Sequence, residues 1–213
     1  MLLLRSKQKV LAAILRNPGI HVNALIKIIG SLKNIKTILD ELEQANLIYS
    51  KHIGNIRQLF PTLDNSFSVS TFELVEEQEK QNSMKKFSII KDLINRIDSF
   101  KKILEKNLIS IALFGSIARG YLTKESDIDI LFIVKKENSA QKNKLTKLFQ
   151  TISLNAGREI APILIEKNEF KKQLNQNNSF AIQVQKERII LYNKKEFLSL
   201  QNNQQAALSK ARI

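Results

Sequence analysis

Residues that cross-link or interrupt a polypeptide are scarce in this sequence. Its 213 residues include no cysteine, three prolines and six glycines. The lack of cysteine excludes disulfide bonds and thiolate metal sites, and it is compatible with a reducing compartment. Because so few residues break helices, the composition favours long ones.

Long apolar runs are missing as well. The apolar residues Met1–Leu4 are followed at once by Arg5, Lys7 and Lys9, so we expect no signal peptide. No stretch approaches the roughly 18 uncharged apolar residues that a membrane-spanning helix needs. We therefore expect a cytoplasmic protein with no membrane partner.

Negative charge is in short supply. The chain has 34 Lys and Arg residues against 20 Asp and Glu residues, a formal net charge of +14. Such a surplus attracts polyanions such as DNA, RNA or nucleotides, although lysine can also serve only to keep a protein soluble. With 43% hydrophobic and 25% charged residues, the chain is expected to be globular rather than disordered.

The N-terminal part of the chain has the pattern of three helices followed by a hairpin. Apolar residues recur at helical spacing in the helices, and Gly54-Asn55 marks the hairpin turn. Ser31 is the expected N-cap of the third helix. The predicted elements are helices over Lys7–Arg16, Val22–Ile29 and Ser31–Asn46, and strands over Leu47–Ser50 and Ile56–Phe60.

This pattern resembles a winged helix-turn-helix, which we assign to residues 1–65. The resemblance implies double-stranded DNA as a partner, with the third helix as recognition helix. Its early half would meet DNA, and two basic residues of the hairpin would lie near phosphates. A domain of this kind that contacts protein or forms a homodimer is the alternative. The DNA-binding candidates are Lys33, Asn34, Lys36, Thr37, Lys51 and Arg57.

The rest of the chain divides into a linker and a second domain. Residues 66–86 predict a largely polar helical linker, and residues 87–213 predict a domain of short strands and helices. The fold class is therefore α+β, with a small mixed sheet flanked by helices. The expected strands are Ile109–Phe114, Asp127–Val134, Glu159–Ile165 and Arg188–Tyr192, and the helices after the first strand are Ser139–Leu154, Asn168–Asn175, Ser179–Gln185 and Lys194–Ala211.

A strand, a tight turn, a short helix and a second strand follow one another over Leu113–Leu131. Gly115 stands at the turn, where a glycine lets a ligand approach the backbone closely. Ser116 adds a hydroxyl at the same place, and Arg119 lies one helical turn further on. A guanidinium there can bind a phosphate or brace the loop.

Two aspartates open the second of these strands. Asp127 and Asp129 are two residues apart, so their side chains point to the same face. Two like charges this close are unfavourable unless a cation or hydrogen-bond donors lie between them. Together with a phosphate-binding turn they suit Mg²⁺-assisted phosphoryl chemistry. The plainer alternative is an ordinary turn, with Asp127 as a cap and Asp129 in an ion pair.

The motif Gly-Ser-x-x-Arg-Gly followed by Ser-Asp-Ile-Asp resembles the minimal nucleotidyltransferases of the DNA polymerase beta superfamily, over roughly residues 88–165. The resemblance implies that Gly115 and Ser116 hold the phosphates of an NTP, with ATP expected. Asp127 and Asp129 would bind Mg²⁺. The reaction would transfer a nucleoside monophosphate to an acceptor hydroxyl and release pyrophosphate.

The sequence differs from that family at the third carboxylate. A third carboxylate normally lies on a later strand, and the position that aligns with it is Ala161. Glu159 lies two residues earlier and on the same face, about 7 Å away along the strand. Glu159 is therefore the candidate third catalytic residue beside Asp127 and Asp129.

Three functions are open at this point. The main hypothesis is a nucleotidyltransferase that binds Mg-NTP and is coupled to a DNA-binding winged helix. One alternative is a DNA-binding transcriptional regulator whose degenerate transferase domain senses nucleotide. The other is an antitoxin-like transferase that modifies a partner protein. Ala161 favours the regulator, whereas a catalytic Glu159 keeps both transferases possible.

Overall fold

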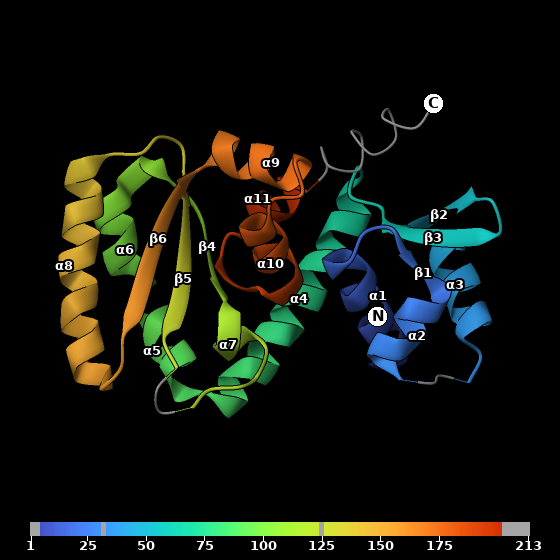
Figure 1. Ribbon diagram of the computed structural model, residues 1–213, viewed down its shortest axis with the longest axis horizontal. Coiled ribbons are helices and arrows are strands. Elements are labelled where there is room, and N and C mark those ends of the chain that lie inside the picture. The colour runs from blue at the N-terminus through green and yellow to red at the C-terminus, as the bar shows by residue number, and fades with distance from the viewer. Residues whose placement is uncertain (1–4, 31–32, 124–125, 202–213) are drawn as a thin grey trace. The chain divides into compact units, whose positions relative to one another are not determined.

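The computed structural model describes residues 5–30, 33–123 and 126–201. Its contacts separate the chain into two compact units, and the division falls between Glu76 and Glu77, inside one long helix. The fold is α+β, as the sequence predicts (Figure 1).

The first unit contains short helices and a three-stranded antiparallel sheet with the order β1-β3-β2. Its core consists of apolar residues that recur at helical spacing in the first helix, with Leu25, Leu39 and Leu59 packed among them. The elements are α1 (Arg5–Arg16), β1 (Ile20–His21), α2 (Val22–Ile29), α3 (Ile35–Gln44), β2 (Ile48–Ile53), β3 (Ile56–Pro61) and the start of α4 (Ser66–Lys86).

Two details of this unit differ from the sequence prediction. The two-residue strand β1 was not predicted, because it carries no periodicity of its own and exists only through pairing with Leu59 and Gln58 of β3. Helix α3 begins at Ile35, since Asn34 adopts a left-handed backbone conformation with a φ of 68°. Asparagine tolerates that region better than most residues. The expected cap, Ser31, lies outside the described residues.

The second unit is built on a four-stranded mixed sheet with the order β6-β5-β4-β7, in which only β5 and β6 run parallel. All four predicted strands are present. The elements are the end of α4, α5 (Ser88–Asn95), α6 (Ile97–Leu104), η1 (Glu105–Asn107), β4 (Leu108–Phe114), α7 (Gly115–Ala118), β5 (Ile128–Val134), α8 (Ser139–Ala156), β6 (Ile160–Glu166), α9 (Lys167–Asn175), α10 (Ser179–Glu187), β7 (Ile189–Tyr192) and α11 (Lys194–Ser199). Helix α11 thus ends at Ser199, and the rest of the helix predicted to reach Ala211 falls after residue 201, outside the described residues.

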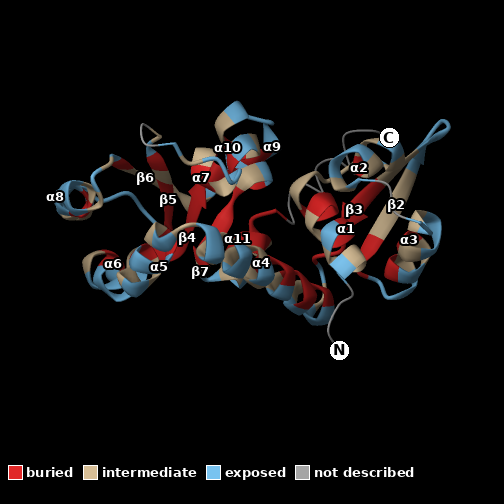
Figure 2. Ribbon diagram, turned by 90° about the horizontal axis from the view of Figure 1, so that it is seen from below, coloured by how far each residue is buried: buried red, intermediate tan, exposed pale blue. Residues whose placement is uncertain are grey.

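The sheet is covered on both faces, so its central strands are buried. Helices α5, α6 and α8 lie on one face, and α9, α10 and α11 lie on the other (Figure 1). On the first face Phe132 of β5 meets Phe100 and Phe149 at ring-centroid distances of 5.4 Å and 5.7 Å. Figure 2 shows β4 and β5 buried along nearly their whole length, which explains their continuous apolar sequence.

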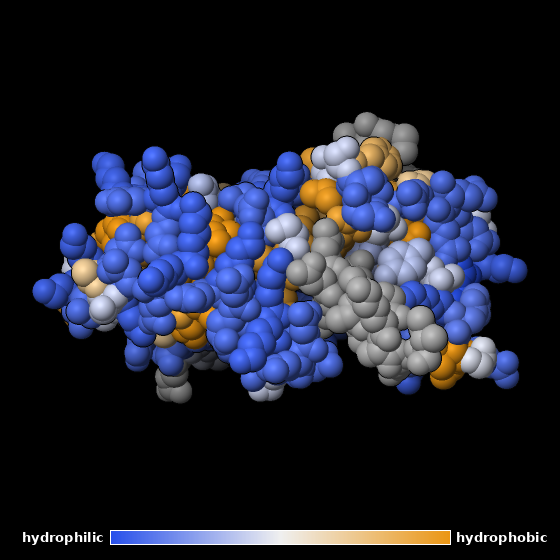
Figure 3. Space-filling model, turned by 90° about the horizontal axis from the view of Figure 1, so that it is seen from above, coloured by the Kyte–Doolittle hydropathy of each residue, from blue (hydrophilic) through white to orange (hydrophobic). Residues whose placement is uncertain are grey.

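The surface agrees with the charged composition. Hydrophilic side chains dominate the face of the molecule in Figure 3, and apolar residues appear only in small patches between them. Within the described residues, no helix combines the length and the apolar character that crossing a bilayer requires.

Candidate functional site

Gly115 stands where β4 turns into α7. Its φ is +72°, a backbone conformation that residues with a side chain rarely adopt. A Cβ atom added at this position would lie 2.4 Å from Oδ2 of Asp129. Both the backbone conformation and the lack of space for a Cβ atom therefore require glycine here. Any group bound against this turn lies beside the Asp129 carboxylate.

The strand register explains this close approach. Phe114, the last residue of β4, is the antiparallel partner of Asp129 on β5. The next residue of the turn, Ser116, donates a hydrogen bond of 3.3 Å from its hydroxyl to the carbonyl of Asp127. The turn and the start of β5 are thus held together at the two aspartates.

The carboxylates of Asp127 and Asp129 repel each other. Burial raises the pKa of Asp129, the charge of Asp127 raises it further, and the guanidinium of Arg119 opposes both. A hard cation with oxygen ligands would relieve this repulsion. Mg²⁺ in proteins is often held by one or two carboxylates together with substrate phosphates, and that donor set fits Asp127 and Asp129.

Arg119 has a partner that the sequence did not indicate. Its Nη1 donates to both carboxylate oxygens of Glu187, at 2.9 Å and 2.8 Å. Glu187 also accepts a hydrogen bond of 3.2 Å from the backbone nitrogen of Gly115. The arginine and the glutamate are 68 residues apart, and no local pattern at the end of a helix marks such a contact.

Ala161 stands at the position that the family resemblance assigns to a third acid. Ala161 on β6 is the parallel partner of Asp129, so the two side chains share one face of the sheet. Glu159 lies just before β6, exposed, and its carbonyl accepts a hydrogen bond of 3.0 Å from the nitrogen of Ile128. In the part of the chain that the structure describes, no three acidic, histidine or cysteine side chains are grouped closely enough to hold a metal ion. The catalytic role of Glu159 stays a prediction.

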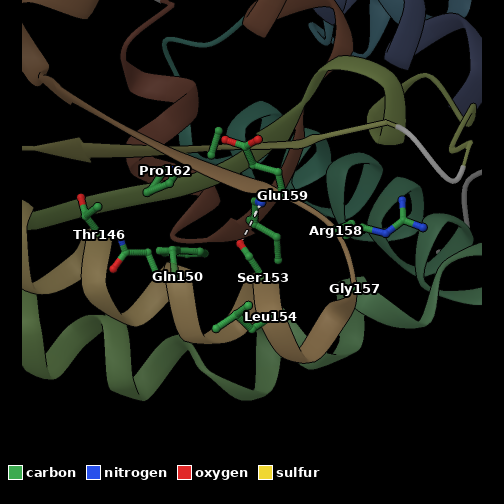
Figure 4. A pocket seen from close by; sticks show the side chains of 11 residues that line it. Thr146, Gln150, Ser153, Leu154, Gly157, Arg158, Glu159 and Pro162 are labelled. Carbon is green, nitrogen blue, oxygen red and sulfur yellow. Dashed lines mark hydrogen bonds between the residues drawn. The ribbon is translucent and has the colours of Figure 1, made fainter.

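A groove of about 900 Å³ lies between α8 and β6. Figure 4 shows Gln150 and Ser153 of α8 on one side of β6, whereas the side chain of Glu159 points away from α8. Ile160 and Pro162 line the groove, and strand alternation places them on the face opposite Ala161. Glu159 and Ala161 also line the groove, whereas neither Asp127 nor Asp129 does, so the groove meets the candidate site only along the start of β6.

The predicted DNA-binding residues of the first unit fall into two groups. Lys33, Asn34, Lys36 and Thr37 are all exposed around the start of α3. The two hairpin residues are engaged within the unit. The ammonium of Lys51 lies 5.5 Å from the ring centre of Phe60.

Arg57 is the second of these hairpin residues, and it contacts α3. Its Nη2 lies 2.8 Å from a carboxylate oxygen of Glu43 and 3.6 Å from one of Asp40. These ion pairs attach the hairpin to the helix. The expected contact of Arg57 with DNA phosphate therefore competes with a contact inside the unit.

Comparison with known proteins covers the second unit. Residues 97–192 match a family model described as a nucleotidyltransferase domain. The putative protein adenylyltransferase MJ0141 of Methanocaldococcus jannaschii is 33% identical over 98 residues, which are 44% of this chain and 99% of that protein.

Two solved structures are more distant. A mutant of the toxin–antitoxin pair MntA-HpeT is 18% identical, with 56% of this chain and 98% of that chain covered and a TM-score of 0.32. A toxin–antitoxin complex with AMP-PNP is 22% identical, with the same coverage and a TM-score of 0.34. Scores this low support no argument about fold or function.

The nucleotidyltransferase part of the resemblance is confirmed by the family model and by the Methanocaldococcus jannaschii relative, and the match extends past the expected limit at residue 165. The matched segment begins in α6 and ends with β7, so it contains the Gly115 turn and both aspartates. The chain belongs, through residues 97–192, to the nucleotidyltransferase domain family.

Proposed function

We propose that the second unit transfers the AMP group of Mg-ATP to a hydroxyl group of a partner protein. The observation that carries the proposal is the contact between the Gly115 turn and Asp129, where a Cβ atom would come within 2.4 Å of the carboxylate. A phosphate bound at this turn lies next to two acidic side chains. The relative from Methanocaldococcus jannaschii carries the name of a putative protein adenylyltransferase, which favours a protein as acceptor.

Each residue of the site has a distinct role in the proposed transfer. Asp127 and Asp129 would hold Mg²⁺, which supplies neutralisation of phosphate charge when it is bound. Arg119 and the hydroxyl of Ser116 lie at the turn and can donate hydrogen bonds to phosphate oxygens. The acceptor oxygen forms a bond to the α-phosphorus, and the bond from that phosphorus to the bridging oxygen breaks. Pyrophosphate leaves with the bonding electrons.

The proton of the acceptor hydroxyl needs a base. The side chain that faces Asp129 across the strands is the methyl group of Ala161, which cannot accept a proton. Glu159 is exposed and has the same strand parity as Ala161, so it is the candidate base. A base further from the aspartates implies slow transfer, which suits an enzyme that modifies a partner a few times rather than one that turns over rapidly.

The test compares two radiolabels on ATP. The full chain is incubated with Mg²⁺, a cell extract and ATP that is labelled either on the α-phosphate or on the γ-phosphate. Relative to extract without the chain, we expect additional label on protein only from the α-phosphate, and no additional label with Asp129→Asn. Glu196→Gln is the matched control, because Glu196 pairs with Lys167 outside this site. Equal labelling by the wild type and Asp129→Asn refutes the proposal.

A second proposed activity concerns the first unit, which we propose binds double-stranded DNA. The order helix, strand, helix, helix and hairpin, with the sheet order β1-β3-β2, supports the proposal because it resembles that of a winged helix-turn-helix. Acidic residues in the second half of α3 are paired within the unit, since Glu41 contacts Lys7 at 2.7 Å and Glu43 contacts Arg57. The exposed basic end of α3 is thus left to face a polyanion.

Salt dependence tests this proposal. Fluorescence anisotropy with a labelled duplex should show that Lys33→Ala with Lys36→Ala weakens binding and lowers the slope of log K against log salt by about 2. Lys144→Ala with Lys147→Ala, two exposed lysines of α8, serves as the control. Equal slopes in the two double variants favour a winged helix that contacts protein or forms a homodimer. DNA binding without any AMP transfer favours the nucleotide-sensing regulator.

A further inference from the structure

Glu187 accepts hydrogen bonds from three different residues beside the Gly115 turn. Its Oε2 accepts from the Gly115 nitrogen at 3.2 Å, from Nη1 of Arg119 at 2.8 Å and from Nε2 of Gln183 at 3.1 Å. Its Oε1 accepts from the same Nη1 at 2.9 Å. The side chain of Glu187 is only 19% exposed, whereas that of Arg119 is 45% exposed. The glutamate is therefore the fixed member of the pair.

The position of Glu187 is set by the residue after it. Glu187 is the last residue of α10, and Arg188 is completely buried. The guanidinium of Arg188 donates to the carbonyl of Gln185 and lies 5.2 Å from the ring centre of Phe197. The end of α10 cannot move away from α7 without taking a buried cation from its place, which is costly.

The two groups of the turn that donate to Glu187, the Gly115 amide and the Arg119 guanidinium, differ in how many N–H hydrogens remain for a phosphate. An amide nitrogen carries one hydrogen, so the nitrogen of Gly115 is not available to a phosphate while it donates to Glu187. A guanidinium carries five N–H groups, and among the described residues only Nη1 of the Arg119 guanidinium makes a hydrogen bond. Its Nη2 and Nε remain for a phosphate. Gly115 thus contributes space beside Asp129, and Arg119 contributes the donors.

We infer that Glu187 is a positioning residue for the phosphates of the nucleotide, acting through Arg119. This inference rests on the function proposed above. Glu187 holds Nη1 of Arg119 through both carboxylate oxygens, which leaves Nη2 and Nε of the guanidinium for a phosphate. It also pins the Gly115 nitrogen and so keeps the turn in its left-handed conformation.

The negative charge of Glu187 could instead oppose nucleotide binding. Its negative charge adds to those that raise the pKa of Asp129, and it would also repel a phosphate. In that case Glu187 would be an internal competitor of the nucleotide for the same donors. Two features favour positioning. The positive charge of Arg119 offsets the negative charge of Glu187 directly. Without Glu187, the half-exposed Arg119 side chain would have to be ordered when the nucleotide binds, which lowers the affinity for the nucleotide roughly tenfold.

The experiment measures binding rather than turnover. Isothermal titration of the full chain with Mg²⁺ and a non-hydrolysable ATP analogue should give about tenfold weaker binding for Glu187→Gln, which keeps the shape of the side chain but loses its charge. Arg119→Gln should weaken binding at least as much. Because Glu187 acts through Arg119, the double variant should bind no more weakly than Arg119→Gln alone.

Controls separate this role from a general loss of structure. Glu187→Asp keeps the charge and should recover part of the affinity, and it also serves if Glu187→Gln fails to fold. Glu196→Gln, which removes a carboxylate from another ion pair on α11, should bind like the wild type.

Three results overturn the inference while the proposed function stands: unchanged binding by Glu187→Gln, tighter binding by it, or additive losses in the double variant. Tighter binding would identify Glu187 as the internal competitor. A wild-type chain that does not bind the Mg²⁺-nucleotide complex at all overturns the proposed function and this role together.

Discussion

Replacing Gly115 with alanine tests the contact on which the proposed site rests. At a φ of +72° an alanine pays about 1–2 kcal/mol for a left-handed backbone. Its Cβ would also lie 2.4 Å from Oδ2 of Asp129, a distance at which the carboxylate has to move. Forcing that side chain off its rotamer adds about 0.5–1.5 kcal/mol. We expect Gly115→Ala to lower the free energy of unfolding by about 1.5–3.5 kcal/mol in total.

Gly157 supplies the matched control. Its φ is +63°, and no atom lies within 4 Å of the position that a Cβ would take. Gly157→Ala should therefore cost only the backbone contribution of about 1–2 kcal/mol. Both glycines belong to the second unit, so urea unfolding monitored by circular dichroism compares the same transition in the two variants.

Removing the carboxylate separates the two contributions. In an Asp129→Ala background, Gly115→Ala should cost no more than Gly157→Ala does, because the atom that it meets is gone. The Gly115→Ala variant should also lose Mg²⁺-dependent nucleotide binding, whereas Gly157→Ala should keep it. Equal destabilisation by the two single substitutions would refute the close approach of the turn to Asp129.

Two other predictions concern stability. Burial opposes the ionisation of Glu77, but hydrogen bonds from Lys194 and Lys80 outweigh it and lower its pKa from 4.5 to about 2. A lowered pKa means that the ionised form stabilises the fold above pH 4.5 and that this contribution is lost as the pH falls toward 2. The free energies of unfolding of the wild type and Glu77→Gln, measured by urea titration, should therefore differ at pH 7 and converge in acid. Because this group is partly exposed, the difference at pH 7 should be less than about 1 kcal/mol. Asn138 caps α8 by accepting a hydrogen bond of 3.1 Å from the nitrogen of Gln141, so Asn138→Ala should cost about 1 kcal/mol and Asn138→Asp nearly nothing in the same assay.

The candidate site could be predicted from the sequence to the extent that it is local. Gly115, Ser116, Asp127 and Asp129 lie within fifteen residues of one another, on a strand, a turn and the next strand of a hairpin-like unit. Strand parity alone places both aspartates on one face. The pairing of Ala161 with Asp129 was not predicted, because it depends on the parallel register of β5 and β6.

What the sequence could not indicate depends on contacts between distant segments. Glu187 reaches the Gly115 turn because α10 packs on the same face of the sheet, and nothing around position 187 encodes that arrangement. The strand β1 exists only through its pairing with β3. Arg57 was expected to face a phosphate, because charge and position in a hairpin do not reveal that Glu43 lies within 2.8 Å. Each of these features arises from tertiary packing rather than from local propensity.

Ala161→Asp returns a carboxylate to the position opposite Asp129 and asks whether the missing acid limits the site. The two residues are parallel partners, so the new side chain would lie on the same face as Asp129. Without a cation, a further like charge beside Asp127 and Asp129 should lower the melting temperature relative to Ala161→Asn, which is matched in shape but uncharged. With Mg²⁺ the order should reverse, since an ion that binds only the folded state stabilises it in proportion to its affinity, by about 2.7 kcal/mol at a hundredfold excess over Kd. Thermal unfolding of both variants with and without Mg²⁺ measures this difference independently of any activity. If Mg²⁺ stabilises Ala161→Asp no more than Ala161→Asn, the aspartates are not arranged around a cation, and the reading of Asp127 and Asp129 as metal ligands is wrong.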